Sequence, residues 1–308
     1  MNSQPVIEID RLTKYYGKQE VIQDLSLKVP KGSIYGFLGR NGQGKTTTIR
    51  ILLGMEDPTR GRSSVFGEDS HRLSPQTRAR IGYLPESHDV YGWMTVQECA
   101  KFQAGFFKTW NQDIFEAIIT HFRLTAKMKA GTLSRGQRAG LCLALTLAPD
   151  PELLVLDDPA LGLDPVARRS LLQSLLFVAR KADRTILFSS HLLADVERIA
   201  DRIAILDDGR LRADCTIETF RQQLKSFVLK FPSAPPQAPQ IPGLLQSIRT
   251  ERALTLTVAN AAPDLESQLE ALLPLSIEPT DLSLEDAFIS YVGDRGEKTF
   301  FMPEAKSK

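Results

Sequence analysis

Residues 39–46 form the stretch of this sequence that is richest in groups able to do chemistry. They match the pattern G-x-x-x-x-G-K-[ST], in which glycines let the backbone curl until successive N–H groups point at one anion. Lys45 can reach the outer phosphates, and the Thr46 hydroxyl can ligate Mg²⁺. The alternative is a glycine-rich turn with a chance lysine, and the presence of every fixed residue argues against it. We therefore predict a nucleoside triphosphate site formed by Gly39, Arg40, Asn41, Gly42, Gln43, Gly44, Lys45, Thr46 and Thr47.

A second chemical signal is the pair Asp157 and Asp158, which ends the apolar run 153–156. An apolar strand that ends in an acid places a carboxylate at the carboxyl edge of a sheet, where ligands of open α/β sheets bind. Asp157 would hold Mg²⁺ directly or through water, and Asp158 would face the attacking water. A simple helix cap is the alternative, which the phosphate loop upstream makes less attractive.

The elements that must position these residues alternate between strands and helices. The apolar run 34–38 predicts a buried strand before the loop, and 45–53 predicts the helix after it. Further strands are expected over 80–84, 153–156, 185–189 and 203–206, with helices over 165–181 and 192–199. This alternation predicts an α/β fold: a P-loop NTPase core with a parallel, doubly wound sheet. Strands over 6–10 and 24–29 add antiparallel strands at the N-terminus.

Two changes in predicted secondary structure and composition along the chain suggest the domain organisation. Residues of about 88–150 are mostly helical, with helices over 95–107, 113–122 and 134–147, and we expect an inserted helical lobe. After about residue 225 a proline-rich loop over 232–239 separates short strands from two helices. We predict a nucleotide-binding domain over 1–222, a small α+β appendage over 223–293 and a flexible tail over 294–308.

Composition excludes several classes of protein. The chain has 308 residues, of which 38 are basic and 37 acidic, so its net charge of +1 does not suggest binding of nucleic acid through bulk charge. Cys99, Cys142 and Cys215 have no C-x-x-C partner and are expected to be buried thiols in a reducing compartment. No signal peptide is evident, and the longest apolar stretch, 139–148, is too short to span a bilayer. We expect a cytoplasmic protein.

The pentapeptide Leu133-Ser134-Arg135-Gly136-Gln137 is the third signal. The Ser134 hydroxyl and the Gly136 N–H would lie at a helix N-terminus, which makes a second anion cradle; an ordinary capped helix is the alternative. The order of phosphate loop, pentapeptide, acid-ended strand and Ser190-His191 resembles the ATP-binding cassette (ABC) family over roughly residues 5–220. The pentapeptide is similar to the family signature Leu-Ser-Gly-Gly-Gln.

This resemblance implies a shared site. In the family, the signature of one subunit closes over the ATP held by the phosphate loop of another, so Ser134, Gly136 and Gln137 would contact a neighbour's nucleotide. Tyr16 matches the aromatic residue that stacks on adenine, although Tyr15 or core packing are alternatives. His191 matches the histidine that contacts the γ-phosphate. Residues 162–164 match the loop that crosses the dimer interface. His71, His88 and His121 have no such context and are expected at the surface.

Three positions depart from the family pattern. Asp158 stands where the general base is usually Glu, and the lost methylene retracts the carboxylate by about 1–1.5 Å, a misplacement that can cost roughly a hundredfold in rate. Glu86 replaces the Gln that senses Mg²⁺ and contacts the membrane partner; it could ligate Mg²⁺ but could not donate a hydrogen bond. Arg135 replaces a signature glycine. Either hydrolysis is retained, which we favour, or the subunit is impaired and acts as an ATP-gated clamp.

The resemblance also implies partners. ATP and Mg²⁺ would draw this chain to a second ABC subunit, in a homo- or heterodimer, that drives separate transmembrane permease subunits at the inner face of the membrane. Apolar residues of 91–94 and 113–122 could meet the permease, although core packing is expected for most. The segment 284–288 is similar to one in export systems. The rival class acts on DNA or ribosomes, but its long coiled coil or second cassette is not found here.

Overall fold

The computed structural model describes residues 4–182 and 184–293, so the predicted tail over 294–308 lies outside the described residues. The chain divides into two compact units, Met1–Leu211 and Arg212–Lys308. β10 (Arg210–Thr216) runs across this division. We describe each unit by itself.

The first unit is organised around a six-stranded sheet with the order β10-β9-β3-β8-β7-β6. β3 (Ile34–Leu38) pairs in parallel with β8 (Thr185–Ser190) and β9 (Arg202–Asp207), and β7 (Leu153–Asp157) lies parallel to β8 and β6 (Ile81–Leu84). Every residue of β3, β7 and β8 is buried, as expected for parallel strands covered on both faces. The predicted parallel α/β core is confirmed.

A second sheet in this unit is antiparallel and has the order β2-β1-β4-β5. β1 (Ile7–Tyr16) and β2 (Gln19–Val29) form a long hairpin, joined by β4 (Arg60–Val65) and the short β5 (Glu68–Asp69). Alternate residues of β2, among them Leu25, Leu27 and Val29, are buried in a core shared with the phosphate-loop helix. This sheet therefore holds one side of the phosphate loop.

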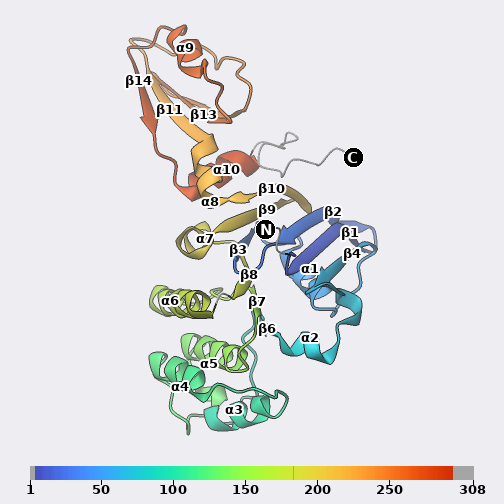
Figure 1. Cartoon of the computed structure of the whole chain (residues 1–308). Helices are drawn as coiled ribbons and strands as arrows, with labels where there is room; N and C mark the ends of the chain where they lie inside the picture. Colours follow the sequence, from blue (N-terminus) through green and yellow to red (C-terminus); the bar gives the residue numbers. More distant parts are fainter. Residues whose placement is uncertain (1–3, 183, 294–308) are drawn as a thin grey trace. The chain divides into compact units, whose positions relative to one another are not determined.

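Helices of the first unit flank these sheets (Figure 1). α1 (Lys45–Leu52) follows β3, and the 3₁₀ turn Ser70–Arg72 and α2 (Pro75–Ala79) lead to β6. The lobe contains α3 (Val96–Ala104), α4 (Gln112–His121), the 3₁₀ turn Ala130–Thr132 and α5 (Arg135–Leu147). α6 (Pro165–Ala182) and α7 (Leu193–Ile199) connect the last parallel strands. α5 packs mainly against α4 and also contacts β6.

The second unit is a small α+β structure. Its sheet has the order β12-β13-β11-β14, built from β11 (Leu224–Lys230), β12 (Leu244–Arg249), β13 (Ala253–Ala259) and β14 (Ser276–Thr280). The helices are α8 (Ile217–Gln223), α9 (Leu265–Glu270) and α10 (Leu284–Gly293). The Asp286 N–H donates to the Ser283 hydroxyl at 3.0 Å, which caps α10.

All three cysteines are buried, as expected. Burial raises the pKa of the Cys142 thiol to about 12. Among residues 4–182 and 184–293, none of the helices has the length and apolar character needed to cross a bilayer.

Candidate nucleotide-binding and hydrolysis site

The phosphate loop lies between β3 and α1, where most of its residues line one cavity. Gly44 adopts a left-handed φ of 93°, and a Cβ atom there would come within 2.7 Å of the Val21 carbonyl oxygen, so glycine is required. The Lys45 ammonium donates to the carbonyl oxygens of Gly39 and Arg40 at 2.6 and 3.0 Å. Burial lowers the pKa of Lys45, while the nearby carboxylates of Asp158 and Asp157 oppose that shift. Lys45 is thus a cation held inside the loop.

Gln43 braces the loop from outside: its side-chain oxygen accepts a hydrogen bond from the Asp208 N–H. The remaining loop residues, Asn41, Gly42, Gly44, Thr46 and Thr47, line the cavity, whereas Arg40 is exposed at its edge. The continuous segment predicted from the sequence as a phosphate loop therefore lines one cavity.

Asp157 joins the loop to the sheet. Its Oδ1 accepts hydrogen bonds from the Thr46 hydroxyl at 3.1 Å and from the Ser189 hydroxyl at 2.8 Å. β7 and β8 pair Asp157 with Ser189, so parallel register brings the two side chains to the same edge. A hydroxyl beside a carboxylate is a set of hard oxygen ligands suited to Mg²⁺. The residues present therefore fit this ion, which would also use phosphate oxygens.

Asp158 and His191 form a second pair beside the first. The backbone at Asp158 is left-handed, with φ 43°, and its N–H donates to the Ser189 hydroxyl at 2.9 Å. The Asp158 Oδ2 lies 2.6 Å from Nδ1 of His191, whereas the buried Oδ1 has no hydrogen-bond partner among the described residues. Burial raises the pKa of Asp158, and the hydrogen bond and charge of His191 work against that rise. An unpartnered carboxylate oxygen is free to accept a proton or a water hydrogen.

A cavity of about 400 Å³ lies beside the two pairs; Asp158 lines it, whereas His191 is not among its lining residues. Lys45, Thr46 and Asp157 line it together with Asp158, and Glu86 reaches it from the loop after β6. Glu86 is exposed, and its negative charge acts to raise the pKa of Lys45. The structure thus brings together the residues that the sequence assigned to phosphate, metal and water.

The two aromatic candidates for adenine stacking differ in their contacts. Tyr16 is 45 % exposed, lies close to Thr47 of the loop and carries the Lys14 ammonium over its ring at 5.1 Å. Tyr15 instead donates its hydroxyl to Glu20 at 2.7 Å. Core packing is excluded for both because both are exposed. Tyr16 has the better position, since it lies close to the loop.

The signature residues lie apart from this cavity, on the lobe. Ser134 and Gln137 form a reciprocal capping box at the start of α5: the Gln137 N–H donates to the Ser134 hydroxyl at 3.2 Å, and the Ser134 N–H donates to Gln137 Oε1 at 3.1 Å. A Cβ atom at Gly136 would come within 2.7 Å of the Ala167 Cβ, so glycine here allows α5 to approach α6. The second cradle is present as a local structure, but nothing in this single chain brings it to Lys45.

His88 corrects the expectation of a surface histidine. It is only 6 % exposed, because the loop after Glu86 folds it against the lobe and the turn after β7. Burial lowers the pKa of His88, and a hydrogen bond from its ring to the backbone of Pro159 opposes that shift. His71 and His121 are exposed as expected.

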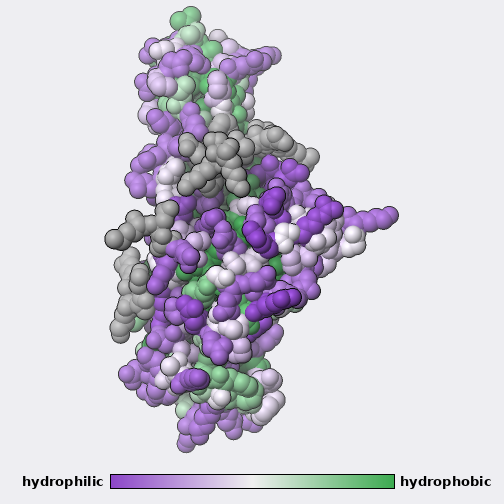
Figure 2. Space-filling model, turned by 45° about the vertical axis from the view of Figure 1, so that its right-hand side comes forward, coloured by the Kyte–Doolittle hydropathy of each residue, from purple (hydrophilic) through white to green (hydrophobic). Residues whose placement is uncertain are grey.

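Core packing was expected for most apolar residues of 91–94 and 113–122, and two of them are exceptions. Tyr91 and Trp93 are 54 % and 71 % exposed, whereas Met94 and the apolar residues Phe115 and Ile118 of α4 are buried. With Phe102 of α3 and Phe106 in the turn after α3, they form an aromatic patch in which neighbouring rings lie 5.1 to 6.0 Å apart. Figure 2 shows a mostly hydrophilic face with apolar residues gathered at its lower end, in the lobe that contains α3.

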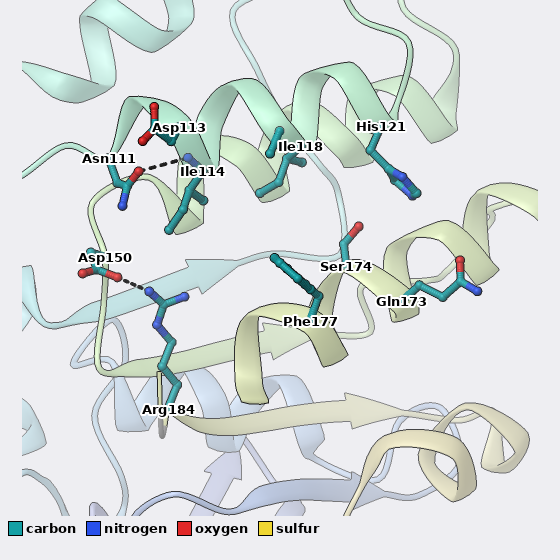
Figure 3. A pocket seen from close by; sticks show the side chains of 11 residues that line it. Asn111, Asp113, Ile114, Ile118, His121, Asp150, Gln173, Ser174, Phe177 and Arg184 are labelled. Atoms are coloured by element: carbon teal, nitrogen blue, oxygen red, sulfur yellow. Dashed lines mark hydrogen bonds and ion pairs between the residues drawn. The ribbon is translucent and has the colours of Figure 1, made fainter. Parts of the chain in front are cut away.

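A larger cavity of about 640 Å³ lies between α4 and α6 and contains none of the phosphate-site residues. In Figure 3, Ile114 and Ile118 face Phe177 across it, and the Arg184 guanidinium pairs with Asp150 at one end. This ion pair connects the residue before β8 to the turn after α5. The cavity is therefore a gap in the packing around the lobe and is not part of the phosphate site.

Comparisons with known proteins identify the family. The profile described as "ABC transporter" matches residues 22–161. A bacitracin transport ATP-binding protein of Bacillus licheniformis is 33 % identical over 72 % of this chain and 74 % of its own length. The chain belongs to the ABC transporter family. Within it, the Nod factor export ATP-binding protein I of a Rhizobium species is 32 % identical over 96 % of this chain and 100 % of its own.

Solved structures agree with this assignment. A structure described as that of the ATP-binding subunit of an ABC transporter has a TM-score of 0.64 and 29 % identity over 71 % of this chain and 92 % of its own. This ABC transporter chain is therefore an ATP-binding, ATP-hydrolysing subunit of the family. The resemblance inferred from four short motifs is confirmed at the level of family and fold.

Proposed function

We propose that this chain is the ATP-hydrolysing subunit of an exporter, and that it works as a dimer beneath separate permease subunits at the inner face of the membrane. The observation that carries the proposal is the single cavity at the carboxyl edge of the sheet, where Lys45, Thr46, Asp157 and Asp158 meet. Two relatives are named for Nod factor export and for bacitracin transport, and these names support export. The two relatives differ in the cargo that their names give.

Lys45 and the loop would bind the triphosphate. The loop N–H groups, the N-terminus of α1 and the ammonium present positive charge to the phosphates, so the developing charge on the transferring group is stabilised where it forms. Tyr16 would stack on the base, since it is exposed and lies close to Thr47 of the loop.

Thr46 and Asp157 would hold Mg²⁺, with Glu86 close enough to ligate it or a bound water. The ion, when bound, supplies charge neutralisation to the phosphate oxygens. Within the described ranges no group of three His, Cys, Asp or Glu residues is arranged as a protein-only metal site. A site completed by a hydroxyl and by substrate oxygens is what Mg²⁺ usually takes.

Asp158 would position the attacking water, and His191 would orient Asp158. We infer that hydrolysis is retained despite the shorter side chain, because the contact of 2.6 Å with His191 fixes one carboxylate oxygen while the other remains unpartnered and buried. The lost methylene predicts a slower reaction than Glu would give.

Ser134, Gly136 and Gln137 would complete the site in trans. They cap α5 on the lobe, away from the cavity of their own chain, and present a helix N-terminus that suits a phosphate. A second copy, or a close relative, would bring this end to the γ-phosphate. The aromatic patch formed by Tyr91, Trp93, Phe102 and Phe106 would meet the permease, because such an exposed group of rings adjoins the Glu86 loop.

Cysteine crosslinking tests this arrangement directly. In a chain carrying Ser134→Cys and Asn41→Cys, we expect an intersubunit disulfide only with a non-hydrolysable ATP analogue and Mg²⁺. Adding Lys45→Ala should abolish the crosslink. Absence of crosslinking with bound analogue would overturn the sandwich, and co-purification with ribosomes or DNA in place of membrane proteins would overturn the transport role.

A further inference from the structure

Lys14 connects two parts of the nucleotide site that are distant in sequence. It belongs to β1, two residues before Tyr16, and its Nζ forms an ion pair with Glu56 Oε1 at 3.1 Å. The same ammonium donates to the Asp57 carbonyl oxygen at 2.7 Å. Glu56 and Asp57 follow α1, the helix that begins with Lys45, so Lys14 joins the β1–β2 hairpin to the segment after the phosphate-loop helix.

The Lys14 ammonium is also placed against an aromatic ring. Its Nζ lies over the Tyr16 ring, 5.1 Å from the ring centroid, which is within the range of a cation–π attraction. The Lys14 side chain is only 13 % exposed, and such an attraction strengthens when the cation is partly removed from water. Glu56 and Asp57 engage two of the three N–H donors of the ammonium, so the cation is held in place over the ring.

This contact makes the two faces of the Tyr16 ring different. Lys14 covers one face, while the tyrosine as a whole remains 45 % exposed. An exposed tyrosine can occupy several rotamers, and a fixed cation on one face favours the rotamer that keeps the contact. β2 pairs Gln19 with Tyr16, and Val21 of the same strand lines the phosphate cavity. The ring is therefore held at the end of the hairpin that adjoins the phosphate loop, with one face left for a base.

We propose that Lys14 is a positioning residue for nucleotide binding, whose ammonium fixes the Tyr16 ring so that the uncovered face stacks on the base of ATP. This inference rests on the proposed function, in which Tyr16 stacks on adenine. Lys14 is not among the described residues that line the phosphate cavity, so it acts on affinity through Tyr16. The alternative is an ion pair with Glu56 that only anchors β1, and its loss would affect folding whether or not Tyr16 is present.

A double-mutant cycle separates positioning from anchoring. Lys14→Met keeps the aliphatic stem and removes the charge, whereas Lys14→Arg keeps a cation that can lie over the ring; each is made with Tyr16 and with Tyr16→Leu. Lys28→Met is the matched control, because Lys28 also lies on a strand and pairs with a glutamate, Glu8, at 2.6 Å. For each full-length variant, titration calorimetry gives the Kd of a non-hydrolysable ATP analogue with Mg²⁺. The melting temperature is measured without nucleotide.

We expect Lys14→Met to raise the Kd about fivefold and Lys14→Arg to raise it less than about twofold, because a cation over a tyrosine face gives a modest stabilisation that either basic side chain can supply. Lys28→Met should leave the Kd unchanged. In the Tyr16→Leu background, Lys14→Met should change the Kd less than about 1.5-fold, whatever its effect on the melting temperature, because the ring through which Lys14 acts is gone.

Three results would overturn the role of Lys14 while leaving ATP binding intact: an unchanged Kd in Lys14→Met, a loss with Lys14→Arg as large as with Lys14→Met, or an equal loss with and without Tyr16. If Lys14→Met does not fold, Glu56→Gln serves in its place, since it releases the ammonium from its ion pair and should raise the Kd only when Tyr16 is present. A wild-type chain that does not bind the analogue would overturn the proposed function as well.

Discussion

Nδ1 of His191 lies 2.6 Å from Oδ2 of Asp158, so the residue after β8 directly holds the residue after β7. A hydrogen bond of this length involving a carboxylate is among the stronger ones in proteins. It fixes one oxygen of Asp158, while the other oxygen is buried without a hydrogen-bond partner among the described residues. His191 thus holds the proposed general base, Asp158, through one of its two carboxylate oxygens.

Substitution of Asp158 tests whether it acts on water. Asp158→Asn removes the charge with little change in shape, and we expect the steady-state turnover of the assembled complex to fall by about 100-fold or more. Asp158→Glu should raise turnover if the length of the side chain limits the rate. The same substitution should lower the melting temperature, because the left-handed φ of 43° at this position suits Asp better than Glu. If Asp158→Asn turns over like the wild type, Asp158 is not the base.

The raised pKa of Asp158 predicts a pH dependence. The carboxyl must be ionised to accept a proton, so kcat should fall as pH drops through a pKa higher than that of an ordinary aspartate. The free energy of unfolding changes in the opposite direction. Because the native state holds this proton more tightly than the unfolded chain, the contribution of Asp158 to the free energy of unfolding declines as pH rises through the raised pKa. Turnover at saturating Mg²⁺ and ATP over about pH 5–9 measures the first effect. The acid limb should be absent from the residual rate of Asp158→Asn.

Removal of the Lys45 ammonium should abolish nucleotide use. Lys45→Ala takes the buried cation out of the loop and leaves the carbonyl oxygens of Gly39 and Arg40 without their donor. We expect hydrolysis to fall by about 100-fold or more, and binding of a fluorescent ATP analogue to weaken. Lys31→Ala, in the exposed turn before β3, controls for the loss of a lysine and should bind normally.

The aromatic patch can be tested with a matched pair of phenylalanines. Phe106 in the patch is 69 % exposed and Phe177 on α6 is 67 % exposed, so truncation of either removes a similar amount of apolar surface. Phe106→Ala should weaken co-purification with the permease several-fold and leave ATP binding unchanged, whereas Phe177→Ala should do neither. Equal effects of the two substitutions would contradict a permease contact at the patch.

Local sequence determined much of this fold because the essential segments carry their own signals. The run 34–38 is uniformly apolar and buried on both faces, and the loop after it needs Gly44 and Lys45 at fixed spacing. Strands with mixed polarity were missed. β4 begins with three exposed residues and β12 ends with three, so neither shows a clean alternation, and their pairing depends on partners distant in sequence.

Within the site, the sequence predicted which residues lie at the end of a strand. It did not predict which side chains of the neighbouring strand contact them. Ser189 was missed as the shared partner of Asp157 and Asp158, because parallel register alone brings it there. The burial of His88 was missed for a similar reason, since Pro159 lies far along the chain. Polar residues that act through tertiary contacts leave little trace in local patterns.

The buried state of Cys99, Cys142 and Cys215 makes the native protein a convenient background for site-directed probes. Thiolate is the reactive species, and a thiol such as Cys142 with a pKa of about 12 stays protonated at neutral pH. Maleimide dyes or spin labels should therefore modify an introduced surface cysteine selectively. Distances between two subunits could then be followed through a cycle of nucleotide binding and release without first removing any natural sulfur.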